Sequence, residues 1–336
     1  MTTTMSTTVT EAREARRGFR PRGMVWLVLR QHRVTAWAAL GLLTAFLAAL
    51  VVLRSEMTDY VRAHDLKDAC TLTADCRPSE KTLDFFRANL ADPLHYGGIV
   101  IEFLPMVVAA FVAGPLIARE LESGTYKLAW TQSVSPVRWL AVKLAVPGAA
   151  VLAGVSLLAA VYTWTWRRLP AQMAPGQWWF RSYEMIGPVP VAQCLLGVAV
   201  GAVAGLLLRR TVAAMGAAAL ATSLVTGMVL EPLRQKLTGP ATELSREMPG
   251  LISGADDWIV ERGMIGEGGG RIPEPDCGVG VSPEDCVTQH HATGWYLDYH
   301  PASHLWPMQW VETGIAVALA ALVGALAFRL VRRQCP

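Results

Sequence analysis

The chain has 336 residues, of which 52% are hydrophobic and only 17% are charged, and its formal net charge is +3. Soluble domains usually carry about 25% charged residues. The shortage of charge therefore argues against an ordinary soluble domain, and the location of the charge-free stretches shows why.

The first 22 residues are rich in Thr and Arg, and they are predicted to form a disordered cytoplasmic tail. The rest of the chain, residues 23–336, is predicted to be one transmembrane domain. In residues 24–34, apolar side chains precede Arg30, His32 and Arg33. This stretch either lies flat at the membrane surface or forms the first turns of a long first helix.

Long apolar runs dominate the chain after residue 33. Residues 34–53 contain no charge, and twenty helical residues span roughly 30 Å, the thickness of the hydrocarbon core of a bilayer. This run is expected to be a retained helix, because Arg54 comes directly after it with no convincing signal-peptide cleavage site. Six such runs predict an all-α polytopic membrane protein. The predicted spans are about 34–53, 97–118, 140–164, 188–208, 211–230 and 310–330, with outer loops 54–96, 165–187 and 231–309.

The distribution of basic residues gives the orientation. The N-terminal segment, 119–143, 209–210 and 329–336 together hold 16 Lys and Arg against four acids. The connections on the other side are far longer, yet they hold 14 basic and 21 acidic residues. Lys and Arg favour the cytoplasmic side of short loops. We therefore expect both termini in the cytoplasm of a multi-pass plasma-membrane protein.

The predicted outer loops carry aromatic residues and cysteines. Trp164, Trp166, Trp178 and Trp179 lie where an aromatic belt is expected, and the last loop contains a Gly-rich patch typical of flexible chain. Cysteine pairs at short spacing on an oxidising face suggest disulfides, with free thiols as the alternative. The pairs are Cys70 with Cys76 and Cys277 with Cys286.

The polar segment ARELESGTYKLAWTQSV, residues 118–134, lies between the second and third spans. Gly124 and Thr125 are expected to end one helix and start another, because Gly permits tight turns and Thr is a good N-cap. Ser135 followed by Pro136 reads as the N-cap and first position of the third span. The segment therefore predicts a short amphipathic helix at the cytoplasmic surface, with an ordinary inner loop as the alternative.

This segment, continued as RELESGTYKLAWTQSVSPVRWLAVKL, resembles the region after the second span in ABC-2 type permeases of ATP-binding-cassette exporters. The six-span layout with both ends inside resembles that family (the type V exporter fold) as well. The Arg-rich composition resembles actinobacterial members. The matching positions are Arg119, Glu120, Glu122, Gly124, Thr125, Leu128, Ser135, Pro136 and Lys143.

The resemblance implies that residues 119–131 couple the permease to a separate ABC ATPase, through Arg119, Glu120, Glu122, Gly124, Thr125, Leu128 and Trp130. It also implies a second permease copy or paralogue, and export of an amphiphile such as a lipid, peptide or antibiotic-like molecule. The chain has no G-x-x-x-x-G-K-[ST] motif, so ATP and Mg²⁺ are expected on the partner and no cofactor on this chain. Membrane lipids are expected partners, and nucleic acid is not.

Two acids lie inside predicted spans. A charge at mid-bilayer costs roughly 3 kcal/mol, so such residues usually face a cavity or a partner. We expect Glu102 to line the outer part of a pathway near a bend at Pro105, and Glu312 to help position an outer gate. The alternative is that both are shallow interfacial anchors. For Glu120 and Glu122 the alternatives are basic groups on the ATPase, local amides or solvent.

Two other function classes stay open. One is a non-transporting immunity or sensor subunit. The other is a metal-dependent membrane hydrolase using His290, His291, His300 and His304 with Asp298 nearby. The hydrolase is disfavoured because residues 300–304 read HPASH, which lacks the glutamate of a His-Glu-x-x-His site. The expectation is a transport subunit with no enzymatic or metal site of its own.

Overall fold

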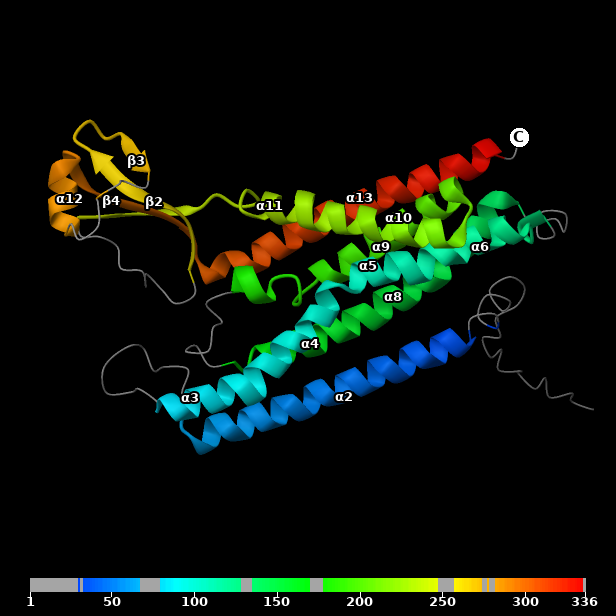
Figure 1. The fold of residues 1–336 in the computed structure, drawn as a ribbon, viewed down its shortest axis with the longest axis horizontal. Helices are drawn as coiled ribbons and strands as arrows, with labels where there is room; N and C mark the ends of the chain where they lie inside the picture. Colours follow the sequence, from blue (N-terminus) through cyan, green and yellow to red (C-terminus); the bar gives the residue numbers. More distant parts are fainter. Residues whose placement is uncertain are drawn as a thin grey trace, which may run out of the picture.

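The computed structural model describes residues 30, 33–66, 79–127, 135–169, 178–246, 257–273, 277 and 282–334. These residues form a long helical bundle with a small β-sheet at one end (Figure 1). Within the described residues, six helices are long and apolar enough to cross a membrane: Arg33–Ala63, Glu80–Ser123, Pro136–Trp166, Val189–Leu208, Thr211–Arg234 and Ala302–Arg333. The predicted number of spans is confirmed.

Several of these helices are interrupted by short π-helical turns. The first, third and fourth spans are α2 (Arg33–Ala63), α8 (Pro136–Trp166) and α9 (Val189–Leu208). The second is built from α3 (Glu80–Phe86), η2 (Arg87–Ala91), α4 (Asp92–Glu102), α5 (Leu104–Val108), η3 (Ala109–Ala113) and α6 (Gly114–Ser123). The fifth joins α10 (Thr211–Leu224), η7 (Val225–Leu230) and α11 (Glu231–Arg234), and the sixth joins η8 (Ala302–His304) to α13 (Leu305–Gln334).

The helices extend beyond the apolar runs. The predicted outer loop 54–96 is partly helical, because α2 continues to Ala63 and α3 starts at Glu80. Hydropathy detects only the part of a helix that suits hydrocarbon, whereas polar turns can continue the same helix outside it. The boundaries predicted from charge-free runs are therefore too short at these ends.

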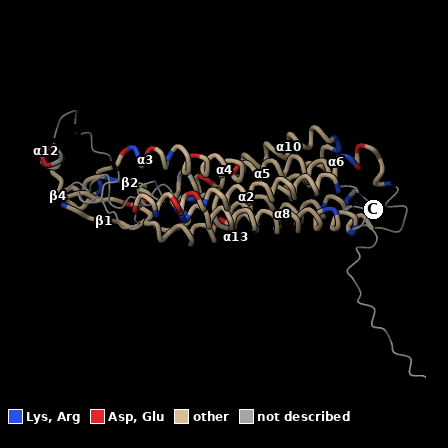
Figure 2. The backbone as a smooth tube through the Cα atoms, turned by 90° about the horizontal axis from the view of Figure 1, so that it is seen from below, with Lys and Arg blue, Asp and Glu red and all other residues tan. Residues whose placement is uncertain are grey.

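The two ends of the bundle differ. One end of the bundle is called the terminal end, and it contains Gly124, the Arg209–Arg210 turn and the C-terminal turn of α13. The opposite end is called the sheet end (Figure 1). Charged residues concentrate towards the two ends, and most of the middle lacks them (Figure 2). This distribution suits helices that pass through a hydrocarbon layer.

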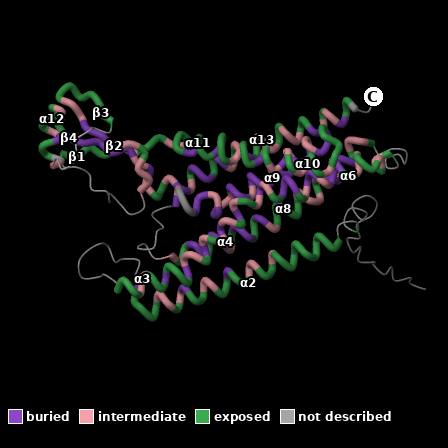
Figure 3. The backbone as a smooth tube through the Cα atoms, in the orientation of Figure 1, coloured by how far each residue is buried: buried purple, intermediate pink, exposed green. Residues whose placement is uncertain are grey.

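Helix α9 lies at the centre of the bundle. Gly197, Gly201 and Gly205 recur every four residues on one face of it. A Cβ at Gly201 would stand 2.7 Å from the backbone oxygen of Ala109, too close to be accommodated without a shift. Small residues at this spacing let helix backbones approach closely in membranes. They pack α9 against the second span, whereas α2 at the edge is mostly exposed (Figure 3).

The predicted all-α class is wrong for the segment between the fifth and sixth spans, which was predicted to be an outer loop. Residues 241–300 contain a four-stranded antiparallel sheet in the order β1-β4-β2-β3. Its strands are β1 (Ala241–Ser245), β2 (Trp258–Gly266), β3 (Arg271–Pro273) and β4 (Ala292–His300). The strand sequences WIVERGMIG and ATGWYLDYH are rich in the β-branched and aromatic residues that favour strands.

Two sequence features stabilise this sheet. The Gly-rich patch is the β2–β3 hairpin turn, where Gly269 has φ +76°, which only glycine adopts readily. Helix α12 (Pro283–Gln289) covers the sheet through Met264, Trp295 and Cys286, and a disulfide joins Cys286 to Cys277. Cys70 and Cys76 lie outside the described residues.

Aromatic side chains connect the sheet to the helices. The Trp258 ring of β2 stacks on Trp179 and meets the edge of Trp178 in η6 (Trp178–Ser182). Trp178 is buried, and the buried Trp166 donates its indole N–H to Ser182 at 3.0 Å. The predicted aromatic belt is therefore wrong for Trp166 and Trp178, which pack inside the protein, and it stays a prediction for Trp164 and Trp179.

Candidate functional site

The turn after α6 begins with the break that the sequence predicts, whereas residues 128–134 of the predicted short amphipathic helix lie outside the described residues. Helix α6 ends at Gly124, which has φ +72° in the left-handed region. Helix α8 starts at Pro136, and the hydroxyl of Ser135 accepts a hydrogen bond from the Arg138 amide at 3.3 Å. The break at Gly124 and the Ser135 cap are confirmed. Leu128 and Trp130 lie outside the described residues.

Glu120 bonds to the next span. Its carboxylate accepts one hydrogen bond from the indole N–H of Trp139, at 2.9 Å, and another from the ammonium of Lys143. The side chain of Lys143 is 5% exposed and that of Glu120 is 18% exposed. The pair therefore joins the last turn of the second span to the second turn of α8, inside the protein.

Glu122 bonds to a different helix. Its Oε2 atom accepts hydrogen bonds from the backbone N–H of Thr211, at 2.9 Å, and from the Thr211 hydroxyl, at 2.6 Å. Thr211 is the first residue of α10, and Arg210 at the N-cap position makes no side-chain capping bond. An acid near a helix N-terminus satisfies free amides and interacts favourably with the helix dipole. Glu122 thus caps α10 from another helix.

These contacts narrow the roles open to the two glutamates. Glu120 already has a cation and an indole as partners, and Glu122 has an amide and a hydroxyl. The structure supports helix capping for Glu122. For Glu120 it shows an ion pair with Lys143, which was not among the predicted alternatives. Arg119 remains exposed, and it makes no hydrogen bond or ion pair with another described residue. Thr125 is also exposed, with its hydroxyl 2.9 Å from that of Ser123.

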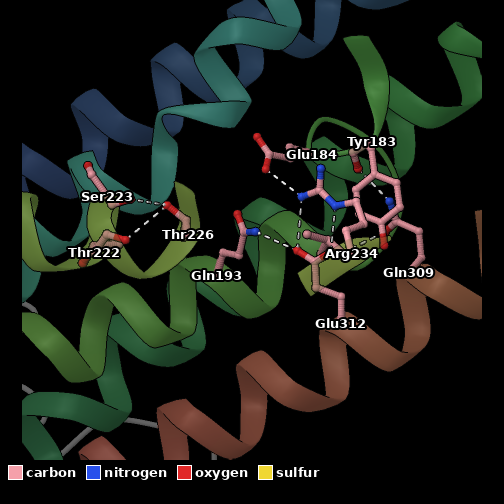
Figure 4. Close-up of polar contacts among 10 residues, drawn as sticks. Tyr183, Glu184, Gln193, Thr222, Ser223, Thr226, Arg234, Gln309 and Glu312 are labelled. Atoms are coloured by element: carbon pink, nitrogen blue, oxygen red, sulfur yellow. Dashed lines mark hydrogen bonds and ion pairs between the residues drawn. The ribbon is translucent and has the colours of Figure 1, made fainter. Parts of the chain in front are cut away.

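A second polar cluster lies at the sheet end (Figure 4). Arg234, at the end of α11, donates from Nε to the Glu312 carboxylate of α13 at 3.1 Å, and from Nη2 to Glu184 at 2.7 Å. The exposed fractions of the side chains are 5% for Arg234, 1% for Glu312 and 22% for Glu184. The interfacial-anchor alternative for Glu312 is therefore wrong, because its carboxylate is buried and paired.

Uncharged groups complete this cluster. Gln193 of α9 donates to Glu312 at 3.2 Å, and the Tyr183 ring lies 4.0 Å from the Arg234 guanidinium. Gln309 of α13 donates to the backbone oxygen of Tyr183 at 2.6 Å. Buried charges are tolerated when they are paired and hydrogen-bonded. The cluster therefore locks α9, α11, α13 and the 182–188 connection together.

Comparison with known proteins now places this architecture. The sequence model of the family described as ABC-2 membrane transporter related matches residues 40–234. The chain belongs to this family. No curated protein and no solved structure matches the chain. The matched region includes Glu120 and Glu122 and ends at Arg234. The sheet and α13 therefore lie outside it.

In this ABC-2 related chain, Glu102 lies at a break in the second span. Helix α4 ends at Glu102, Phe103 is a turn, and α5 starts at Leu104 with Pro105 in its first turn. Glu102 is half-buried, and it makes no hydrogen bond or ion pair with another described residue. The predicted bend near Pro105 is present.

The structure separates the histidines that could have formed a metal site. His290 and His291 precede β4, whereas His300 and His304 lie at and beyond its other end, and nine extended residues span roughly 30 Å. Asp298 is bound by Arg271 and Thr242. His300 is buried, with its Nδ1 atom 3.1 Å from that of His304, and this burial lowers the pKa of His300. The four-histidine hydrolase site is not assembled.

Five residues of these two clusters were not predicted from the sequence: Arg234, Glu184, Gln193, Trp139 and Thr211. An acid inside a membrane usually pairs with another group. The predicted position of Glu312 inside a span therefore already pointed to a basic residue at a similar depth. Arg234 lies just after a long apolar run, and it could have been identified on that ground. Nothing local marks Thr211 or Trp139, because their roles arise from helix packing.

Proposed function

We propose that the chain is the permease subunit of an ABC exporter, which moves an amphiphilic molecule outwards using ATP hydrolysed by a separate subunit. Family membership supports association with an ABC ATPase. The sequence has no phosphate-binding loop of its own, so ATP and Mg²⁺ belong to the partner.

The observation that carries this proposal is the anchoring of the turn after α6. Glu120 bonds α6 to α8, and Glu122 bonds α6 to α10. A displacement imposed at this turn therefore acts on three spans together. An ATPase that binds residues 119–131 could in this way reposition the helices, and the exposed side chain of Arg119 is available for that contact.

The orientation belongs to the same proposal. The basic clusters that flank the first and last spans favour a cytoplasmic terminal end. Residues 1–22 would then form a cytoplasmic tail, and loops 54–96, 165–187 and 231–309 would lie outside. A second permease copy or paralogue completes the transporter, and exposed apolar faces on α2 and α10 suit contact with that copy or with lipid.

The test is reconstitution of the chain with its ABC ATPase in liposomes, with co-purification and ATPase stimulation as readouts. Arg119→Glu reverses an exposed charge and is expected to lower both readouts by about tenfold, the effect of losing a charge-assisted contact. Arg332→Glu is the matched control, since Arg332 is an exposed arginine at the same end. Unchanged co-purification of the Arg119 variant contradicts docking at this turn.

A backbone variant tests the turn itself. Gly124→Ala places a side chain on a residue with φ +72°. No other atom lies within 4 Å of the added Cβ, so any effect comes from the strain of the left-handed backbone, which costs roughly 1–2 kcal/mol. Gly148→Ala is the control, because its Cβ also meets nothing but its φ is not positive. Only the first change is expected to uncouple ATPase activity from transport, and Gly124→Asn should partly restore it.

A further inference from the structure

A groove opens on the side of the bundle towards the sheet end. It has a volume of about 510 Å³ and lies between α8, α9 and α13, within the range of about 300–1,000 Å³ typical of ligand pockets. Its walls are mainly apolar side chains, and the exposed Leu152, Trp164 and Val317 form part of its lining. In a membrane, such a groove faces the acyl chains.

Arg167 lines this groove and also a second, smaller recess. That recess has a volume of about 90 Å³ and is lined by Thr58, Val61, Arg62, Arg167 and Arg168. The apolar groove and a basic recess therefore meet at one residue, Arg167.

Arginines concentrate around this junction. Arg54 stacks over Trp164 at 3.6 Å, and Arg167 lies 5.3 Å from the ring of Trp306. Arg62, Arg167 and Arg168 are exposed, and none forms an ion pair with another described residue. On α2, Glu56 and Asp59 lie about 160° and 140° around the helix from Arg54, whereas Asp59 lies only about 60° from Arg62 but forms no ion pair with it in the structure.

We propose that this composite site binds an anionic phospholipid of the leaflet at the sheet end. The phosphate lies among Arg62, Arg167 and Arg168, and an acyl chain fills the apolar groove. An anionic lipid suits the site better than a helix of a second copy of the chain. Such a helix would fill the apolar groove but would leave the three arginines without a negative charge beside them. Guanidinium groups bind phosphate by paired, charge-assisted hydrogen bonds.

The test is native mass spectrometry of the purified chain with phosphatidylglycerol or phosphatidylcholine. The wild-type chain is expected to retain phosphatidylglycerol about tenfold better than phosphatidylcholine, because the loss of one charge-assisted hydrogen bond corresponds to that factor. Arg167→Gln with Arg168→Gln should remove this preference. Arg332→Gln with Arg333→Gln changes another exposed pair of neighbouring arginines, at the other end of the bundle, and should preserve it.

A second variant pair tests the acyl chain. Ala160 lines the groove, whereas Ala150 is exposed elsewhere on α8 and does not line it. Ala160→Trp should reduce retention of both lipids, and Ala150→Trp should not. Equal retention of the two lipids by the wild type would overturn the proposal, and so would unchanged binding to the Ala160 variant.

Soluble glycerol phosphate distinguishes a lipid from a free anion. It should compete about tenfold less well than phosphatidylglycerol, because it lacks the chain that fills the groove. Competition as strong as that of the lipid would indicate an anion site and contradict the proposal. No ATPase is present, so these results do not depend on whether the turn after α6 couples to a partner.

Discussion

The two polar clusters of this protein use the same chemistry in different surroundings. At the terminal end, Glu120 pairs with Lys143 and remains 18% exposed. At the sheet end, Glu312 pairs with Arg234, and the exposed fractions of the two side chains are 1% and 5%. Each cluster connects helices that are distant in the sequence. They differ in how much water reaches the carboxylate.

That difference determines what each cluster tolerates. A carboxylate with access to water can be rehydrated when its partner is removed, whereas a buried carboxylate keeps its full desolvation penalty. The terminal-end cluster can therefore be remodelled by a partner at modest cost in stability. The sheet-end cluster is expected to stay intact as one body during transport.

The largest effect is predicted for Arg234→Met. This change leaves Glu312 buried without its cation, and loss of one partner of a buried pair costs about 3–5 kcal/mol. The free energy of unfolding, measured by denaturant titration in mixed micelles, should fall by that amount.

The double variant Arg234→Met with Glu312→Gln is the control for this prediction. It removes the charge that the single variant leaves unpaired, so it should recover much of the lost stability. A single variant that loses less than about 1 kcal/mol would mean that water reaches Glu312, and the contrast between the clusters would disappear.

A smaller effect is expected for Lys143→Met at the terminal end. Glu120 keeps its bond to Trp139 and its partial exposure, so the expected loss is about 1–2 kcal/mol. Lys127→Met changes an exposed lysine of the same turn and should be close to neutral. A loss as large as that of the Arg234 variant would show that the two clusters are energetically alike.

The sequence was sufficient to predict the features set by local chemistry. Long apolar runs with few charges revealed six spans, and Gly124, Ser135 and Pro136 revealed where α6 ends and α8 begins. These signals work because bilayer thickness and helix capping act on short segments.

The features set by packing were not predictable in the same way. The contacts of Glu122 with Thr211 and of Glu312 with Arg234 join residues 89 and 78 positions apart. The sheet was missed because its strands are separated by polar and Gly-rich segments that resemble loop. The four-residue glycine repeat of α9 was present in the sequence and indicates close helix packing, so that feature could have been found.

The smallest effect concerns the cap on α10. Glu122→Ala removes the acceptor for the Thr211 amide and hydroxyl, and loss of a helix N-cap costs about 1 kcal/mol. Arg210 already has the extended backbone of an N-cap residue, with φ −127° and ψ 125°, so Arg210→Asp can supply a local cap.

The double variant Glu122→Ala with Arg210→Asp should therefore regain stability. It should not regain ATPase coupling, because the hydrogen bonds between Glu122 of α6 and Thr211 of α10 remain absent. If the double variant regains both stability and ATPase coupling, Glu122 acts only as a helix cap. If it regains neither, Glu122 does not act as a helix cap. This pair of measurements separates helix stability from transmission between helices at the same carboxylate.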